Sequence, residues 1–189
     1  MVPEQIDLNL NKILKQYSES FLSKKFGEES YEVDELMQVY GLTQGIKKEN
    51  KQYWGRELGM CWQLLITELF RLTCKDFKGA IKDGSDEICD LVTKKDAIDT
   101  KYRIGSGDSG TLKKFKQYGK RIKELGYNPI ILILRTDNLK AAITACHTGG
   151  WTILSGEKAY KYITKKTGFD LKKWLKSKKN LYKVRHTLP

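Results

Sequence analysis

The sequence predicts an α/β fold in which a central mixed β-sheet is flanked by helices. Two short apolar segments near Glu87–Val92 and Ala97–Ile104 are separated by a polar turn, which predicts a β-hairpin. The continuous apolar run Pro129–Leu134 predicts a buried strand. Because the helical pattern of Thr111–Leu125 lies between hairpin and strand, we expect a right-handed crossover to a parallel neighbour.

The first part of the chain is predicted to be helical. Residues 4–26 carry apolar side chains at helical spacing, and we expect further helices over Tyr31–Tyr40 and Gln52–Thr73. Residues 41–51, which contain Gly41 and Gly45, are predicted to form a loop. The apolar stripe of the first helix consists of Ile6, Leu10, Ile13, Leu14, Tyr17 and Phe21.

After the parallel strand, the pattern alternates between helix and strand. The predicted elements are a helix at Leu139–Cys146, a strand at Trp151–Leu154, a helix at Glu157–Lys165 and a last helix that begins at Asp170, a good N-cap. We expect a single domain over residues 1–189, with N-terminal helices at about 4–40 and a basic C-terminal extension at about 170–189.

Charge is distributed unevenly along the chain. The net charge is +12, but residues 100–189 hold 21 Lys and Arg against 5 Asp and Glu, whereas residues 1–99 hold 14 against 18. Such asymmetry favours a surface that neutralises the phosphates of a nucleic acid. The alternative is a basic surface that serves solubility alone.

The remaining composition excludes several protein classes. No apolar run approaches the ~20 residues of a membrane span, and the polar start Met1–Gln5 does not predict a signal peptide. Cys61, Cys74, Cys89 and Cys146 form no C-x-x-C pair, so we expect no zinc site. Scattered cysteines in apolar surroundings predict free thiols of an intracellular protein.

The predicted hairpin places three charged residues together. If Val92 faces Ala97, then Asp90 faces Asp99, and Asp99 shares its face of the strand with Lys101. Two carboxylates that converge repel each other unless a cation lies between them. Oxygen ligands alone suit Mg²⁺, and an adjacent lysine can orient a water that attacks a phosphodiester. Asp86 and Glu87 are weaker alternatives to Asp90.

This pattern, Asp90 followed by Asp99-Thr100-Lys101, resembles the PD-(D/E)XK nuclease superfamily and its Type II restriction endonucleases. The resemblance covers roughly residues 55–135: an acid-bearing helix, the hairpin, a Gly/Ser loop, a basic helix and an apolar strand. Cys89 stands where the motif has Pro, and Asp99 where many members carry Glu.

The resemblance implies a restriction-endonuclease-like fold. It also implies hydrolysis of double-stranded DNA with Mg²⁺, for which Mn²⁺ substitutes, to 5′-phosphate and 3′-hydroxyl ends in the cytoplasm of a prokaryotic cell. Since one such site cuts one strand, we expect a homodimer on a palindromic sequence, with the N-terminal helices at its interface. The alternatives are a junction resolvase, a nickase or a repair nuclease of the same superfamily, and a DNA-binding module without activity.

Further site residues are expected on both sides of the hairpin. Glu57 is either a helix carboxylate at the edge of the metal site or a first-turn acid favoured by the helix dipole. The loop Gly105–Gly110 either holds a phosphate, carries side chains to base edges, or caps the following helix. The predicted DNA-binding residues are Arg103, Ser106, Asp108, Ser109, Lys113, Lys114, Lys120, Arg121 and Lys172.

Overall fold

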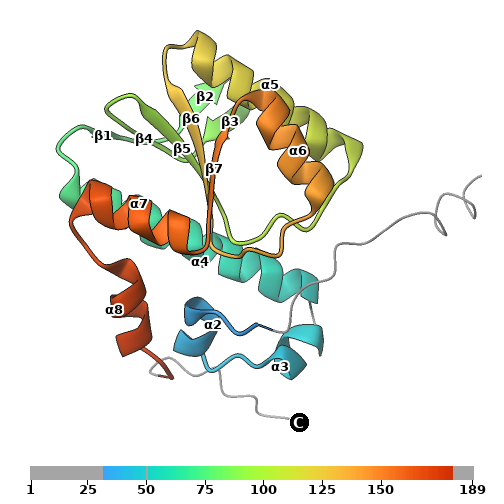
Figure 1. Cartoon of the computed structure of the whole chain (residues 1–189), viewed down its shortest axis with the longest axis vertical. Coiled ribbons are helices and arrows are strands. Elements are labelled where there is room, and N and C mark those ends of the chain that lie inside the picture. The colour runs from blue at the N-terminus through green and yellow to red at the C-terminus, as the bar shows by residue number, and fades with distance from the viewer. Residues whose placement is uncertain (1–31, 50, 181–189) are drawn as a thin grey trace, which may run out of the picture.

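The computed structural model describes residues 32–49 and 51–180 and contains a five-stranded mixed sheet (Figure 1). The strand order is β1-β4-β5-β6-β7; β1, β4 and β5 are antiparallel, and β5, β6 and β7 are parallel. The predicted fold class is thereby confirmed. The strands are β1 (Phe77–Lys78), β4 (Leu91–Thr93), β5 (Asp96–Lys101), β6 (Asn128–Ile133) and β7 (Thr152–Ser155).

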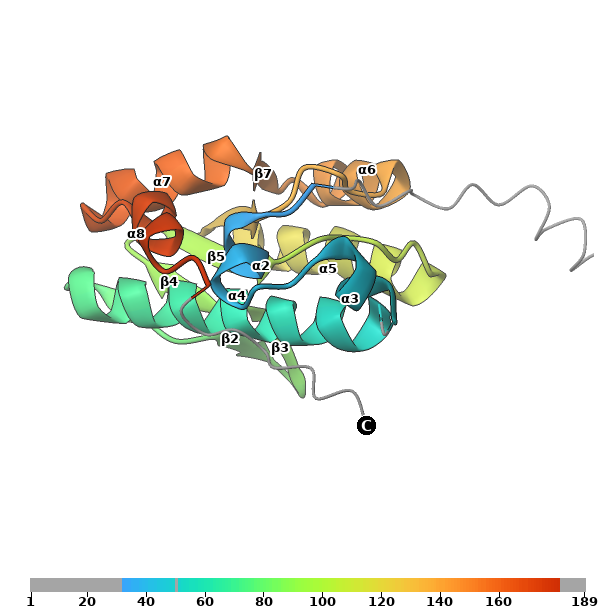
Figure 2. The ribbon, with the colours of Figure 1, turned by 90° about the horizontal axis from the view of Figure 1, so that it is seen from below.

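Helices cover both faces of this sheet, as Figures 1 and 2 show. The parallel connections are made by α5 (Ser109–Glu124), between β5 and β6, and α6 (Lys140–Gly149), between β6 and β7. These two helices pack on one face. The other face is covered by α4 (Lys51–Thr73) and α7 (Glu157–Thr167), with α2 (Glu35–Val39) and α8 (Leu171–Ser177) beyond them.

Strand β6 is apolar and buried from Pro129 to Ile133, and its position in the sheet explains this. Ile130 and Leu132 belong to the core under α4 and α7, whereas Ile131 and Ile133 belong to the core under α5 and α6. Successive side chains of a strand point to opposite faces. Because both faces are covered by helices, residues 130–133 all pack in one of the two cores, as the continuous run predicts.

The hairpin segment departs from the prediction in its boundaries. The predicted strand Glu87–Val92 is wrong as a single element, because β3 (Asp86–Cys89) pairs with β2 (Ile81–Asp83) in a separate two-stranded sheet and only β4 joins the main sheet. The chain changes partner at Asp90. Strand β5 ends at Lys101 and does not continue to Ile104.

The N-terminal elements are only partly as predicted. Helix α4 confirms the helix expected at Gln52–Thr73, and α2 lies within the segment predicted as Tyr31–Tyr40. The prediction of a loop over residues 41–51 is wrong, because α3 (Gln44–Glu49) forms there. The predicted helix over residues 4–26 and the tail beyond Asn180 lie outside the described residues. None of the described helices is long and apolar enough to cross a membrane.

A buried cluster of charged and polar groups joins α2 and α3 to the end of β5. It consists of Asp34, Lys47, Tyr102 and Arg135, of which none is more than 8% exposed. The Tyr102 hydroxyl donates to Asp34, Lys47 Nζ donates to the Tyr102 hydroxyl at 3.1 Å, and Arg135 Nη1 donates to Asp34 at 3.2 Å. Because Tyr102 directly follows Lys101, this buried charge cluster holds the end of β5 against α2 and α3.

Candidate active site

The hairpin of β4 and β5 has the predicted register. Leu91 pairs with Ile98, and Val92 pairs with Ala97. One residue earlier, the N–H of Asp90 donates to the carbonyl of Ile98 at 2.9 Å. Asp90 therefore stands beside the strand residue Asp99, at the point where β4 begins.

The carboxylate of Asp90 is held by three hydrogen bonds. Its Oδ2 accepts from the backbone N–H of Thr100 at 2.7 Å and from the Thr100 hydroxyl at 2.6 Å. Its Oδ1 accepts from Gln63 Nε2 on α4 at 2.7 Å. Because an ionised carboxylate offers about four acceptor sites, Asp90 keeps acceptor capacity in a fixed orientation.

Asp99 and Lys101 form an ion pair on the same face of β5, as the period of a strand predicts. Lys101 Nζ lies 2.8 Å from Asp99 Oδ2 and also donates to the Thr100 carbonyl at 3.1 Å. The side chain of Asp99 is 14% exposed and that of Lys101 is 37% exposed. The pair is therefore partly buried but open to solvent through the lysine.

The pKa values of Asp99 and Lys101 are set by burial and by the charges of this site. Burial raises the pKa of Asp99 to about 6; the Lys101 ammonium opposes this rise and the Asp90 carboxylate adds to it. Burial lowers the pKa of Lys101, but attraction to Asp99 and Asp90 outweighs it and raises that pKa overall. One ammonium thus faces two carboxylates, and a cation near both would relieve the repulsion between them.

Asp90 differs from the prediction in its contacts. The sequence predicts that Asp90, Asp99 and Lys101 share one face of the hairpin. In the structure, the Asp90 carboxylate instead accepts from Thr100 and from Gln63 on α4. The side chain of Thr100 lies on the opposite face of β5 from those of Asp99 and Lys101, because successive side chains of a strand point to opposite faces. The three groups remain within electrostatic reach, because Asp90 acts on the pKa of both Asp99 and Lys101.

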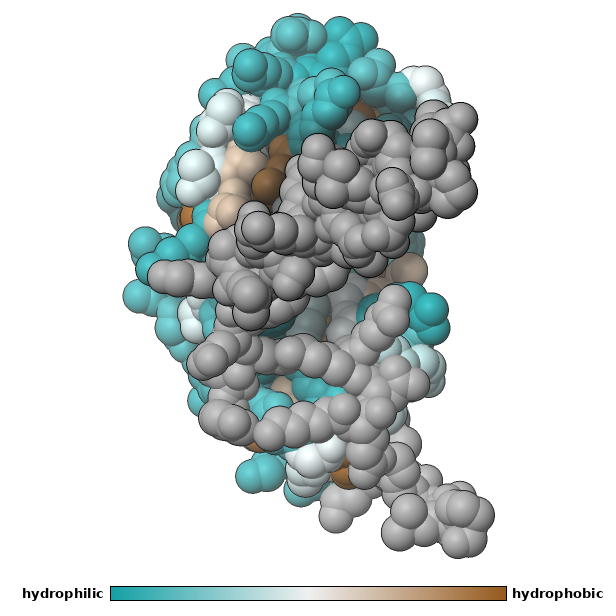
Figure 3. Space-filling view, turned by 90° about the vertical axis from the view of Figure 1, so that its right-hand side faces the viewer, coloured by the Kyte–Doolittle hydropathy of each residue, from teal (hydrophilic) through white to brown (hydrophobic). Residues whose placement is uncertain are grey.

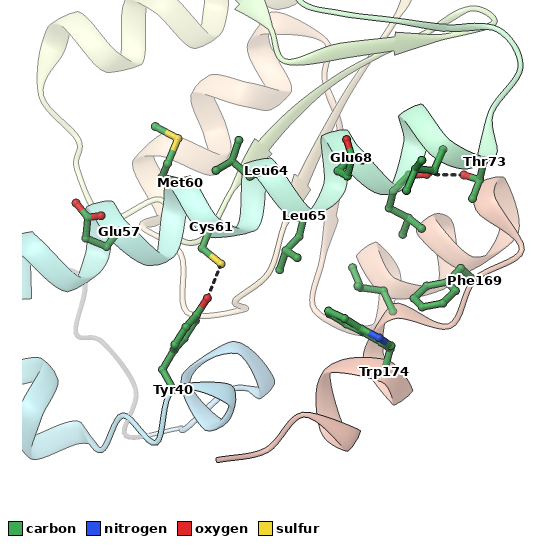
Figure 4. Close-up of a pocket in the computed structure, with 13 residues that line it drawn as sticks. Tyr40, Glu57, Met60, Cys61, Leu64, Leu65, Glu68, Thr73, Phe169 and Trp174 are labelled. Atoms are coloured by element: carbon green, nitrogen blue, oxygen red, sulfur yellow. Dashed lines mark hydrogen bonds between the residues drawn. The ribbon is translucent and has the colours of Figure 1, made fainter. Parts of the chain in front are cut away.

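Helix α4 contributes Gln63, which the sequence did not single out. Glu57, the predicted helix acid, is 45% exposed, pairs with Arg56 at 3.1 Å and lines an apolar groove with Tyr40 (Figure 4). Gln63 lies six residues later, about 120° around the helix, and reaches Asp90. The sequence does hint at this role, because helical spacing places Gln63 beside the buried Trp62 and Ile66, near the side of α4 that faces the sheet.

The loop after β5 is organised by its own polar groups. Asp108 is the N-cap of α5: it accepts from the Thr111 N–H at 2.9 Å, the Thr111 hydroxyl at 2.7 Å and the Ser106 hydroxyl at 2.7 Å. These bonds, led by that from the Thr111 hydroxyl, lower the pKa of Asp108. Of the three roles left open for this loop, capping is the one that the contacts display.

The predicted DNA-binding cations fall into two groups. The cations of the first group form ion pairs with acids of this chain. Arg103, which is 10% exposed, pairs with Asp137, and Lys114 lies 3.5 Å from Asp86. Arg121 pairs with Asp83, and Lys172 with Glu157 and Glu35. By contrast, Lys113 and Lys120 are exposed on α5, with no ion pair to the residues that the structure describes. Helix α5 lies at the top of the molecule in Figure 1, and Figure 3 shows this part of the surface as mostly hydrophilic.

The runners-up to Asp90 have other partners. Asp86 accepts from the Tyr118 hydroxyl at 2.6 Å, and Glu87 is exposed near Lys82, with 3.9 Å between their charged atoms. Both belong to β3, outside the main sheet. Asp90 is therefore the acid that the fold places beside Asp99.

The described cysteines and acids do not form a metal site built from protein ligands alone. All four cysteines are free, and burial raises the pKa of Cys89 to about 11 and that of Cys146 to about 12. Within residues 32–49 and 51–180, no group of three or more His, Cys, Asp or Glu could hold a metal ion. A metal at Asp90 and Asp99 would thus take its remaining ligands from water and substrate.

The family model that matches this chain is described as ApaLI-like restriction endonuclease, and it matches residues 76–180. No curated protein and no solved structure matched. The matched segment is more than half of the chain and includes Asp90, Asp99, Lys101 and the whole five-stranded sheet. The chain therefore belongs to the ApaLI-like restriction endonuclease family and is a Type II site-specific deoxyribonuclease of the PD-(D/E)XK type.

Proposed function

We propose that this chain cleaves both strands of a specific DNA sequence with Mg²⁺, or Mn²⁺ in its place, at a site made of Asp90, Asp99 and Lys101. The observation that supports it most is the pair of carboxylates beside one ammonium at the hairpin, within a family of restriction endonucleases. The expected products carry 5′-phosphate and 3′-hydroxyl ends. We place the enzyme in the prokaryotic cytoplasm, in keeping with its free thiols.

The donor set fits Mg²⁺ in its chemistry. Asp90 and Asp99 would supply oxygen ligands, and a cation at Asp99 would oppose the rise in its pKa that burial causes. When bound, Mg²⁺ would neutralise charge that develops on the scissile phosphate and lower the pKa of a water. Cys89 and Cys146 lie within electrostatic reach of Asp99, but burial raises the pKa of both thiols, so neither offers the thiolate that soft metals prefer.

The chain's own groups would position the reactants. Lys101 Nζ now donates to Asp99 and to the Thr100 carbonyl. With a metal on Asp99, the same ammonium would donate to the attacking water and hold it in line with the leaving oxygen. Gln63 and Thr100 would keep Asp90 aimed at the metal through the three hydrogen bonds that they donate.

Cleavage of both strands would require two copies of the chain. The described residues of each chain contain one such hairpin, and a two-fold dimer places two sites on antiparallel strands. We therefore propose a homodimer that acts on a palindromic sequence.

Plasmid digestion tests the proposed reaction. With Mg²⁺ or Mn²⁺ we expect discrete fragments whose ends map to one short palindrome and accept ligation through 5′-phosphates, whereas EDTA stops cleavage. Ca²⁺ should support specific binding with little turnover, because it meets the same oxygen ligands with looser geometry. Cleavage that persists in EDTA, or cuts without any shared sequence, would contradict the proposal.

Gln63 is expected to act as a positioning residue. Replacing Gln63 by alanine should lower the cleavage rate by roughly 10–100-fold and raise the Mg²⁺ concentration that gives half-maximal rate, because outer-shell partners of metal ligands have effects of this size. Gln38 on α2 is a matched control, because it is half-buried like Gln63 but donates to the Val33 carbonyl instead, and Gln38→Ala should change neither quantity. If Gln63→Ala cleaves with an unchanged metal titration, the contact with Asp90 has no role in the site.

Base reading and phosphate binding should be separable by mutation. We propose that Lys113 and Lys120 contact phosphates. Each alanine variant should therefore weaken binding to cognate and scrambled duplexes alike, and it should reduce the slope of log affinity against log salt concentration by about one unit. If Arg103 or Asp108 contacts a base, its alanine variant should lose about 1–3 kcal/mol of binding free energy for the cognate duplex and little for the scrambled one. Binding to both duplexes across a salt series measures this, and equal losses for Asp108→Ala on both would exclude base reading.

A further inference from the structure

Helix α4 has a second apolar side, turned away from the sheet. Its sheet-facing side is buried through Trp62, Ile66 and Phe70. On the opposite side, Met60, Leu64 and Leu72 are 52%, 61% and 67% exposed. Large apolar side chains that line up on one exposed helix side mark a surface that another element covers.

These residues line a groove between α4 and α8, which we call the α4–α8 groove (Figure 4). Its volume is about 740 Å³, and Phe169 and Trp174 form the wall opposite α4. The carboxylates that line it, Glu57 and Glu68, are paired with Arg56 and Arg71. The groove therefore offers contact to an apolar occupant and few polar groups to orient a small ligand.

The dimensions of the groove fit a helix. It extends along α4 from Glu57 to Thr73, which at 1.5 Å per residue is roughly 24 Å. An amphipathic helix that lays its apolar side into such a groove is a recurrent mode of recognition. A second helix on α4 would bury Met60, Leu64 and Leu72 together.

The chain itself contains a segment of matching length and pattern. The apolar stripe predicted over residues 4–26 runs from Ile6 to Phe21, which in a helix is roughly 23 Å. We propose that the apolar side of this segment fills the α4–α8 groove of its own chain. Its polar side, which carries Lys12 and Lys15, would face solvent.

The short connection between residues 4–26 and the described part of the chain determines in which direction the segment would run along the groove. The described part of the chain begins at Glu32, whose carbonyl accepts from Gln44 and Arg135, and α2 then leads to Tyr40 in the groove. Residues 27–31 bridge up to about 20 Å when extended. Phe21 therefore lies at the Tyr40 end of the groove and Ile6 at the Phe169 end, so the segment runs antiparallel to α4.

The same short connection favours the chain's own groove over that of a second copy. A short linker gives the segment an effective concentration in the millimolar range at its own groove. A second copy would compete only when the protein itself approaches that concentration. The apolar side of residues 4–26 is then unavailable to a subunit interface, which has to use other surfaces.

Hydrogen exchange of the full-length protein, read by mass spectrometry, tests the proposal. In the wild-type protein, amides of residues 4–26 should exchange at least about ten times more slowly than unstructured amides. Leu64→Asp and Ile13→Asp, one on each side of the contact, should both remove this protection. Leu125→Asp is the matched control: Leu125 is 41% exposed on the opposite side of the sheet, at the end of α5, and its variant should retain the protection.

Three results would overturn the proposal. The first is rapid exchange of residues 4–26 in the wild-type protein. The second is protection that persists in Leu64→Asp, since the segment would then pack elsewhere. The third is protection that is lost on about fiftyfold dilution, because only a contact between two copies depends on concentration in this way. Leu64 is exposed in the described structure, so its variant leaves the core intact and the exchange of α4 and β6 verifies this.

Discussion

Replacing Asp90, Asp99 or Lys101 by alanine is expected to abolish DNA cleavage while specific binding in Ca²⁺ persists. Each carboxylate would be a metal ligand, and Lys101 would hold the attacking water. Loss of either role removes several kcal/mol of transition-state stabilisation, which corresponds to a rate loss of at least about a thousand-fold. Nicking and linearisation rates of a supercoiled plasmid measure the effect, and gel shifts in Ca²⁺ measure binding.

Matched controls separate this role from a general effect of charge. Glu68 and Lys78 are exposed acid and base outside the hairpin site, and Glu68→Ala and Lys78→Ala should cleave at the wild-type rate. Asp99→Glu keeps a carboxylate that many superfamily members carry at this position, so it should retain measurable cleavage. Full activity in Asp99→Ala, with an unchanged metal titration, would remove Asp99 from the site.

The second large effect is expected on stability, at the buried charge cluster. Asp34 accepts from the Met37 N–H at 2.8 Å as the N-cap of α2, and also from Tyr102 and Arg135. Removing one partner of a buried ion pair leaves the other charge buried without compensation, which costs about 3–5 kcal/mol. Asp34→Ala should therefore lower the free energy of unfolding by about that amount, as measured by urea denaturation.

Asp170 provides a control with the same local role. It is the N-cap of α8 and accepts from the Lys173 N–H at 2.9 Å, but it is exposed. Asp170→Ala should cost only about 1 kcal/mol, the usual value for a lost N-cap. If the two variants are equally destabilised, the contacts of Asp34 with Tyr102 and Arg135 contribute little to stability.

The parts of the site that the sequence predicts depend on local geometry. The short turn between β4 and β5 fixes the hairpin register, and the two-residue period of a strand puts Asp99 and Lys101 on one face. The crossover rule likewise accounts for β6 as the parallel neighbour of β5. In each case the partner lies in the adjacent element, so spacing along the chain determines the contact.

The parts that it does not predict depend on contacts between distant segments. Gln63 meets Asp90 because α4 packs across the sheet, and although helix spacing puts Gln63 near the sheet-facing side of α4, it does not indicate which residue of a distant hairpin the amide contacts. Lys47 belongs to a Gly- and Lys-containing stretch that resembles a solvated loop, yet it is buried against Tyr102. The acids that neutralise Arg103 and Arg121 come from other elements, which a charge count along the chain does not reveal.

The segment that matches the family begins at residue 76, but the residues that support the candidate active site begin earlier in the chain. Four residues that precede this segment support the site region: Asp34 and Lys47 contact Tyr102, Trp62 contacts β6, and Gln63 contacts Asp90. Transplanting residues 76–180 alone into another protein would carry over the cleavage motif but not its supports. An exchange between relatives should instead be made upstream of Glu32, so that the recipient inherits the complete scaffold around Lys101.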